Sequence, residues 1–462
     1  MTDGIERRAA AMRRAAELGL DYLNSLDERH AGAADEPASV RARLAAPLPE
    51  NGTDPVRVIE ELAAAAEPGL VASAGPRYFG FVIGGALPAA AAADWLTTAW
   101  GQNAALNALS PAAAAAEQVA GAWMLELLNL PRDASFGLPT GAGIGNAVGL
   151  AAARHAVLGR AGWDVEARGL YGAPEISVLI GDEAHATLLT ALQYLGLGRD
   201  RVTRIPTDDQ GRMRADEARR ALAAARGPVI VAAQAGNVNT GAFDPVAELA
   251  DALSAHDNAW LHVDGAFGLW AAALPRLRHL VAGVERADSW STDAHKWLNV
   301  GYDCGFVAVR DPAAHQAAMS ARAAYLMRSD ERENWEWVMD SSRRARGFAL
   351  YAAIRSLGRS GVEALVDRCC RLAERIADRL RQADGVAVLN DVLLNQVLVR
   401  FGDDDARTRA VIAAVQEDGT AWMGGTVWHG VAAMRISVSN WSTTEADADR
   451  TAEAILRCVA AS

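Results

Sequence analysis

The sequence predicts an α/β fold with a mostly parallel sheet, and three observations lead to it. Short, uncharged apolar runs recur through the middle of the chain, and helical stretches separate most of the early ones. This alternation is typical of parallel strands that helices cover on both faces. The 462 residues exceed the usual size of one hydrophobic core, and the C-terminal part has a different pattern. We therefore expect more than one domain.

In chain order, we expect a helical arm at residues 1–75, a large domain at 76–345 and a small α+β domain at 346–462. The arm has helices predicted at 5–26 and 56–66. In the large domain, helices are predicted at 112–128, 143–158, 184–195, 215–225 and 245–256, and strands at 176–180, 202–205, 229–233, 260–263, 289–291 and 306–309. The C-terminal part has helices predicted at 344–380, 406–418 and 445–459, and strands at 386–389, 397–401 and 434–438.

Composition excludes several classes of protein. The net charge of −12 opposes binding to nucleic acid. The four cysteines lack metal-site spacing, so we expect reduced thiols, no bound metal and a reducing compartment. The N-terminus lacks a signal peptide, and no uncharged apolar stretch is long enough to cross a bilayer. These features predict a cytoplasmic protein without a membrane anchor.

The segment TGAGIGN, at residues 140–146, is the first that carries chemistry. Glycines let backbone N–H groups approach an anion, and a helix N-terminus adds a favourable dipole. The same glycines would equally serve a tight turn. A dinucleotide site is disfavoured because the spacing differs from G-x-G-x-x-G and residues 133–139 do not look like a strand.

Two polar residues follow predicted strands. His185 in GDEAH lies beyond one strand and Asp264 in HVDGAFG ends another. Ligands of open α/β sheets bind at this edge. A buried carboxylate needs a cation, and a protonated pyridine nitrogen would serve, with Ala266 leaving room beside it. A structural histidine, or a helix cap or salt bridge for Asp264, are the alternatives.

Lys296 is the most informative residue. It lies between His295 and Trp297 in STDAHKW, an unusual setting for a surface lysine. A lysine in a desolvated pocket becomes a nucleophile for carbonyl groups. An anion-binding turn, a strand-end histidine, a strand-end aspartate and this lysine follow in that order. Together they indicate an enzyme that uses pyridoxal 5'-phosphate (PLP).

At these motifs the chain resembles the group II PLP-dependent amino-acid decarboxylases, which include aromatic-L-amino-acid and glutamate decarboxylases. The resemblance runs from about Val56 to the C-terminus and is strongest at DEAH, QAGNVNTGAFDP, HVDGAFG, DAHKWL and SRRARG. It implies fold type I with a seven-stranded type of sheet and an obligate homodimer with shared active sites. It also implies removal of the α-carboxylate of an L-amino acid, which gives an amine and CO2.

The resemblance implies a role for each matching residue. Lys296 is the Schiff-base lysine, Asp264 pairs with the pyridine nitrogen, and His185 stacks on the ring. The implied cofactor-binding set is Ala142, Gly143, His185, Asn237, Asp264, Ala266, Asp293, His295 and Lys296. Four positions depart from the pattern. Gly143 replaces a serine or threonine, Asn237 and Val238 stand where threonines are common, and Asp293 replaces an asparagine and would repel a phosphate.

The resemblance also bears on the reaction. Tyr325 matches the tyrosine of a mobile loop that closes over the partner's active site and donates a proton to the substrate carbon. Relatives with phenylalanine there form aldehydes. The charged, weakly periodic segment 319–340 suits such a lid, and a phenol can donate a proton once water is excluded. An ordinary buried tyrosine is the alternative.

The substrate itself is not predicted. Phe81 and Val82 match the wall of the substrate pocket, Asn103 aligns near contacts from the neighbouring subunit, and Arg435 aligns near a carboxylate-binding arginine. A strand-end salt bridge is the alternative for Arg435. An aldehyde synthase or oxidase, another PLP lyase and a transaminase are alternative enzymes. A non-catalytic PLP-binding protein is the alternative outside catalysis.

Overall fold

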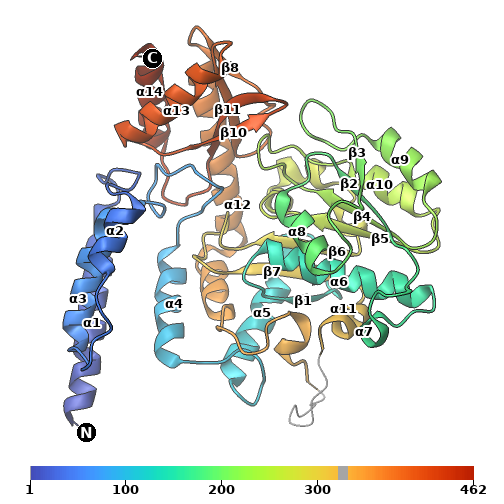
Figure 1. The fold of residues 1–462 in the computed structure, drawn as a ribbon, viewed down its shortest axis with the longest axis horizontal. Coiled ribbons are helices and arrows are strands. Elements are labelled where there is room, and N and C mark those ends of the chain that lie inside the picture. Colours follow the sequence, from blue (N-terminus) through green and yellow to red (C-terminus); the bar gives the residue numbers. More distant parts are fainter. Residues whose placement is uncertain (1, 321–330, 462) are drawn as a thin grey trace.

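The computed structural model describes residues 2–320 and 331–461 (Figure 1). A seven-stranded sheet of order β1-β7-β6-β5-β4-β2-β3 forms its centre. The strands are β1 (Ser135–Gly137), β2 (Ser177–Gly181), β3 (Thr203–Ile205), β4 (Val229–Gln234), β5 (Ala259–Asp264), β6 (Ser289–Asp293) and β7 (Gly305–Val309). Strands β3, β2, β4, β5 and β6 are parallel, whereas β7 is antiparallel to β6 and β1. The predicted α/β fold is confirmed.

Helices cover both faces of this sheet. On one face, α6 (Ala142–Arg160), α8 (Ala186–Tyr194) and α11 (Pro312–Met319) pack over inward-facing residues such as Ile180. On the other face, α9 (Ala215–Ala224) and α10 (Val246–Leu253) pack over Leu179 and its neighbours. Because successive strand residues point to opposite faces and both faces are buried, these strands need apolar residues throughout. The short helix α7 (Val165–Arg168) follows α6.

The C-terminal part forms a separate sheet of order β10-β11-β9-β8, with antiparallel pairing throughout. Its strands are β8 (Val386–Val388), β9 (Gln396–Phe401), β10 (Gly424–Trp428) and β11 (Val431–Ser437), and its helices are α13 (Asp405–Asp418) and α14 (Glu445–Ala461). The long helix α12 (Gly347–Arg381) runs between the two sheets (Figure 1).

The N-terminal helices stand at the edge of the molecule (Figure 1). They are α1 (Thr2–Ser25), α2 (Pro37–Leu44) and α3 (Pro55–Ala66), and α1 packs along α3. Helices α4 (Pro88–Trp100) and α5 (Pro111–Leu127) follow and pack on α12. Across residues 2–320 and 331–461, no helix combines the length and apolar character that crossing a bilayer requires. All four cysteines are buried, with no disulfide among them.

The secondary-structure prediction did not include helices α4 and α11, and three further details were wrong. Residues 133–139 do contain a strand, β1, because its three residues pair with β7, a partner far away in the chain that local sequence does not reveal. The predicted helix 344–380 is interrupted at Gly358, whose φ of 62° is not helical. Strand β10 was missed because its double glycine weakens the local signal, and the hairpin with β11 forms it instead.

Candidate active site

Eight predicted residues line one cavity at the carboxyl edge of the parallel strands. The cavity has a volume of about 260 Å3, and its lining includes Ala142, Gly143, His185, Asp264, Ala266, Asp293, His295 and Lys296. Strand β5 ends at Asp264, β6 ends at Asp293, and α6 begins at Ala142. The parallel sheet therefore brings together residues that lie far apart in the sequence.

Lys296 is the only lysine in the 462-residue chain, in which every other cationic side chain of the Lys/Arg class is arginine. Its side chain is 20% exposed, and its Nζ lies 3.2 Å from Oδ2 of Asp293. A Cβ on Gly84 would lie only 1.9 Å from the Lys296 carbonyl oxygen, so the segment around Gly84 packs directly against this residue. A chain that otherwise uses arginine has an ε-amine at this one partly buried position, where arginine could supply the charge but not the nucleophile. The presence of a single lysine can be read from the sequence alone, and our prediction for Lys296 did not use it.

The N-terminus of α6 forms another wall of the cavity. Gly141 is the N-cap residue, and the Ala142 N–H donates to Oδ1 of Asp293 at 2.6 Å. Gly143 contributes no hydroxyl, but the Thr187 side chain lies beside it and also lines the cavity. Free N–H groups in the first turn of a long helix suit a phosphate, whereas the Asp293 carboxylate does not.

Asp264 is nearly buried and anchored at both oxygens. Its Oδ1 accepts from the Ala266 N–H at 3.2 Å, and its Oδ2 accepts from Asn146 Nδ2 at 2.9 Å. Asn146 belongs to TGAGIGN but was not predicted to serve the site. A carboxylate held by two donors in a cavity wall suits a cationic partner such as a protonated ring nitrogen.

Burial keeps the two cavity histidines neutral. It lowers the pKa of His185, the Asp264 carboxylate partly opposes this shift, and the nearby cations of Lys296 and Arg435 lower the pKa further. His185 caps α8, with its Nδ1 accepting from the Thr187 N–H at 3.3 Å and lying 2.8 Å from the Thr187 hydroxyl oxygen. Burial also lowers the pKa of His295, whose Nδ1 accepts from the Cys304 N–H. A neutral His185 ring suits stacking on an aromatic ligand.

The ninth predicted cofactor residue, Asn237, lies beside the cavity but does not line it. Its Oδ1 accepts from the N–H groups of Asn239 and Thr240, so the side chain braces its own turn. The neighbouring Val238 lines the cavity instead.

The predicted substrate residues are dispersed. Arg435 on β11 is close enough to His185 to affect its pKa, and within the described residues its side chain makes no hydrogen bond or ion pair. Phe81 is 61% exposed and stacks on Trp422, whereas Val82 is fully buried. Asn103 accepts from the N–H groups of Ala105 and Arg343, away from the cavity. Tyr325 lies outside the described residues.

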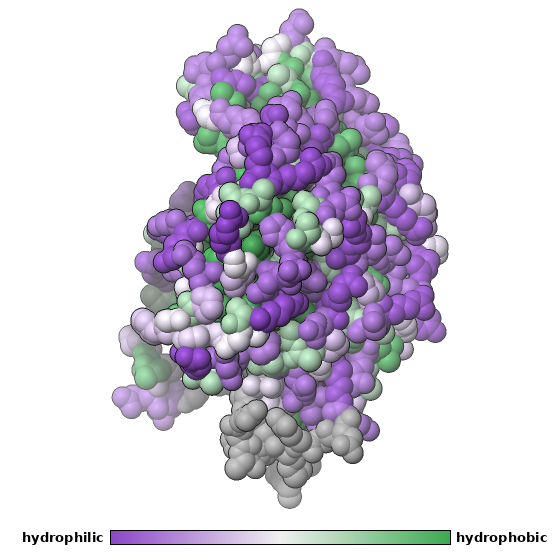
Figure 2. All heavy atoms as spheres, turned by 90° about the vertical axis from the view of Figure 1, so that its right-hand side faces the viewer, coloured by the Kyte–Doolittle hydropathy of each residue, from purple (hydrophilic) through white to green (hydrophobic). Residues whose placement is uncertain are grey.

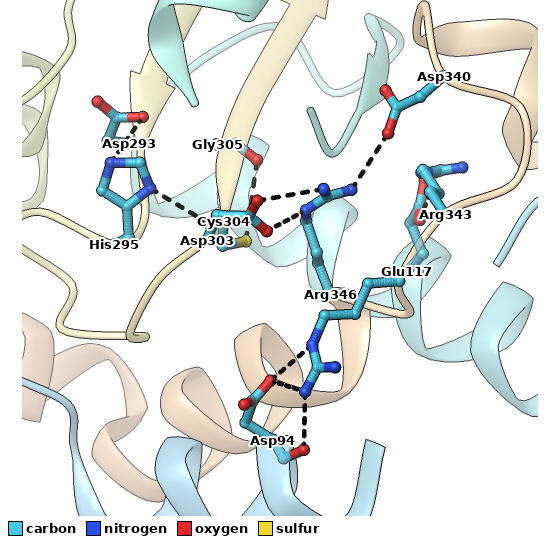
Figure 3. Close-up of polar contacts among 11 residues, drawn as sticks. Asp94, Glu117, Asp293, His295, Asp303, Cys304, Gly305, Asp340, Arg343 and Arg346 are labelled. Carbon is cyan, nitrogen blue, oxygen red and sulfur yellow. Dashed lines mark hydrogen bonds and ion pairs between the residues drawn. The ribbon is translucent and has the colours of Figure 1, made fainter. Parts of the chain in front are cut away.

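The motif SRRARG, at residues 342–347, braces the elements around the site (Figure 3). Arg343 binds Glu117 of α5, and Arg344 binds Asp94 of α4. Arg346 binds Asp303, next to the Cys304 that donates to His295. The motif was part of the resemblance without an assigned role, and its contacts now give it a structural one.

The donor set fits PLP in three respects and opposes it in one. Backbone N–H groups of α6 suit the phosphate, Asp264 suits the ring nitrogen, and Lys296 suits the aldehyde. The carboxylate of Asp293 opposes the phosphate charge at the same helix end. The described residues contain no group of three or more His, Cys, Asp or Glu placed to hold a metal ion.

Comparison with known proteins agrees with this geometry. Residues 37–401 match the family model described as the pyridoxal-dependent decarboxylase conserved domain. The chain is 28% identical to tryptophan decarboxylase 1 of Oryza sativa subsp. japonica, over 93% of this chain and 89% of that protein. It is 27% identical to an aromatic-L-amino-acid decarboxylase of Bacillus atrophaeus, over 87% and 84%. A crystal structure of Oryza sativa TDC with PLP and tryptamine superposes with a TM-score of 0.91 at 25% identity, covering 99% of this chain and 98% of that one.

Proposed function

Because this chain belongs to the pyridoxal-dependent decarboxylase family, and is therefore a PLP-dependent carboxy-lyase, we propose that it converts an L-amino acid to the amine and CO2, with Lys296 holding the cofactor as a Schiff base. The observation that carries the proposal is that the only lysine of the chain shares one cavity with Asp264 and the N-terminus of α6. When bound, PLP supplies an electron sink for the bond that breaks at the α-carbon.

Each wall of the cavity then has a proposed role in holding the cofactor. The N–H groups of α6 bind the phosphate, and the Asp264 carboxylate holds the proton on the ring nitrogen. The neutral His185 ring covers one face of the cofactor and helps to exclude water. Lys296 would hold the cofactor aldehyde through its ε-amine and would serve in the release of the product. The role of Tyr325 as proton donor is proposed from the resemblance alone.

A substrate screen tests the proposed function. The PLP-loaded protein is incubated with each of the twenty L-amino acids, diaminobutyrate and dihydroxyphenylalanine, and CO2, amine, aldehyde and hydrogen peroxide are measured. We expect CO2 and the amine in equal amounts from at least one substrate. Equal amounts of aldehyde and peroxide would favour the aldehyde synthase, and a loaded protein inert towards every substrate would favour the non-catalytic alternative.

Arg435 is proposed to bind the substrate carboxylate. It is a half-buried cation near His185 that forms no ion pair within the described residues. Removing the cation in Arg435→Met is expected to raise KM for the substrate about tenfold to a hundredfold, because a charge-assisted hydrogen bond is lost. Arg435→Lys keeps the positive charge, so its KM should rise less than that of Arg435→Met. An unchanged KM in Arg435→Met would remove this residue from substrate binding.

Asp293 is expected to weaken cofactor binding. Its carboxylate accepts from Ala142 N–H at 2.6 Å, where the phosphate would bind, and carries the same sign of charge. We expect Asp293→Asn to bind PLP about tenfold more tightly, because the repulsion is removed while an acceptor for Ala142 remains. Equilibrium dialysis against the protein freed of cofactor measures this. Weaker binding would show that the Asp293 charge supports the site, for example by orienting Lys296.

We further propose a homodimer with shared active sites. Large apolar side chains are exposed on α4, where Trp95, Leu96 and Trp100 are each at least 45% exposed. The opposite face, around α9 and α10, is mainly hydrophilic (Figure 2). Phe81 and Asn103 do not line their own chain's cavity, which suits residues that serve a partner's. Light scattering should give twice the chain mass, and a monomer with full activity would overturn the proposal.

We propose the cytoplasm as the location, because the four buried cysteines form no disulfide, which is typical of a reducing compartment. Fractionation of cells that produce the tagged protein would test it, since activity in a secreted or membrane fraction would contradict this location.

A further inference from the structure

A chain of buried polar side chains runs behind Asp264, away from the cavity. The Trp260 indole N–H donates to Ser289 Oγ at 2.8 Å, and Ser289 Oγ lies 2.8 Å from His262 Nδ1. His262 Nε2 lies 2.9 Å from Asn146 Oδ1, and Asn146 Nδ2 donates to Asp264 Oδ2 at 2.9 Å. The chain joins β5, β6 and α6, and we call these five residues the Asp264 relay.

The relay is sealed from solvent. Asn146, His262 and Ser289 are fully buried, and Trp260 is nearly so. Gly149 of helix α6 leaves room for the His262 ring, because a Cβ at this position would lie 2.8 Å from His262 Cε1. Ser291 donates a second hydrogen bond to Asn146 Oδ1. Burying this many polar groups costs free energy unless each is satisfied, and here each one is.

The two residues at the ends of the relay, Asp264 and Trp260, determine which group donates and which accepts in every hydrogen bond between them. An ionised Asp264 only accepts, so Asn146 presents its NH2 to Asp264 and its carbonyl oxygen to His262. That oxygen only accepts, so His262 carries its proton on Nε2. Burial lowers the pKa of His262 to about 3, so the ring is neutral and its Nδ1 accepts from the Ser289 hydroxyl. Ser289 in turn accepts from Trp260, which only donates.

We propose that Asn146 and His262 are positioning residues that hold the Asp264 carboxylate in one orientation, so that its remaining lone pairs face the cavity. His262 fixes which way the Asn146 amide points, and Asn146 then donates to Asp264. The inference rests on the proposed function, in which Asp264 pairs with the ring nitrogen. Aligned polar chains of this kind support the donor at their end more strongly than an isolated pair does.

The first test measures the dissociation constant for PLP, together with kcat and KM on the substrate found by the screen. Asn146→Ala is expected to weaken PLP binding and lower kcat by about tenfold to a hundredfold, with KM nearly unchanged. His262→Phe should weaken PLP binding and lower kcat by about tenfold each. His262→Gln retains a donor and an acceptor, so its PLP binding and kcat should be closer to those of the parent protein. In the Asn146→Ala background, His262→Phe should add little.

The matched control is His315. It is also fully buried, its Nδ1 lies 2.9 Å from the Ser135 hydroxyl oxygen, and burial lowers its pKa to about 3, but it belongs to α11 and does not contact the relay. His315→Phe should lower the melting temperature without changing the dissociation constant for PLP. Equal weakening of PLP binding by His315→Phe and His262→Phe would assign both effects to stability and overturn the proposal.

A pair of glycine variants leaves every relay donor and acceptor in place. Gly149→Ala should displace the His262 ring and weaken PLP binding, because its Cβ would meet the ring below 3 Å. Gly159→Ala, on the same helix, meets nothing within 4 Å and should bind PLP as the parent protein does. If both variants bind PLP equally well, the position of His262 does not matter and the proposal fails.

Asp264→Ala separates this inference from the proposed function. If Asp264→Ala binds PLP with unchanged affinity and kcat, the proposed role of Asp264 is wrong. If Asp264→Ala is impaired while Asn146→Ala and His262→Phe bind and turn over normally, the role of Asp264 stands and the relay is overturned.

Discussion

The Lys296→Ala variant is expected to show no measurable turnover and no covalently held cofactor, while remaining folded. The side chain is partly exposed at a cavity wall and its described ion pair is with Asp293, so its loss should cost little stability. No other lysine exists in the chain to take its place. The visible absorbance of the PLP-treated protein and CO2 release from the best substrate measure the effect.

Lys296→Arg is the matched control for this prediction. It keeps a cation opposite Asp293 but offers a guanidinium that stays protonated and does not form a Schiff base with an aldehyde. Both variants should therefore be equally inactive. Turnover at the parent rate in either variant would show that the ε-amine is not the attachment point.

The second large effect is on stability. Arg343 and Glu117 form a two-bond ion pair of 2.7 and 2.8 Å, with both side chains only 1% exposed. We expect Arg343→Met to lower the free energy of unfolding by about 3–5 kcal/mol, because it leaves the Glu117 carboxylate buried and unpaired. Urea unfolding followed by circular dichroism measures the change.

Two further variants show whether the unpaired charge is the cause. The double variant Arg343→Met/Glu117→Met removes both charges and should recover most of the lost stability. Glu61→Gln breaks an exposed ion pair on α3, in which the Arg57 side chain is 72% exposed and the Glu61 side chain 57%, and should leave the free energy of unfolding nearly unchanged. If Arg343→Met costs no more than Glu61→Gln, the buried pair does not stabilise the fold as argued.

The sequence predicted those parts of the site that lie at the ends of regular elements. Asp264 ends a recognisable strand, His185 and Lys296 each follow one, and parallel strands place their carboxyl ends at one edge. The weakest fold predictions were β1 and β10, which are short and depend on partners far away in the chain. Local propensity does not report such pairing.

The Asp264 relay shows what sequence patterns do not reveal. The sequence pattern places Asn146 at the end of a glycine-rich turn and His262 in an apolar strand. Their contact depends on how α6 crosses β5 and β6, and on the space that Gly149 leaves beside the ring. Asn237 shows the reverse, since its motif predicted a cofactor contact but its side chain braces a turn. The orientation of a side chain depends on its three-dimensional neighbours.

The measurement that tests the central claim most directly is chemical trapping of the cofactor. The PLP-loaded protein is reduced with borohydride, digested, and mapped by mass spectrometry. Because the chain has one lysine, a pyridoxyl group on a lysine side chain can lie only at Lys296. We predict one pyridoxyl group per chain at that position. A pyridoxyl group confined to the N-terminal amine, or an unmodified chain, would contradict the claim that Lys296 holds the cofactor.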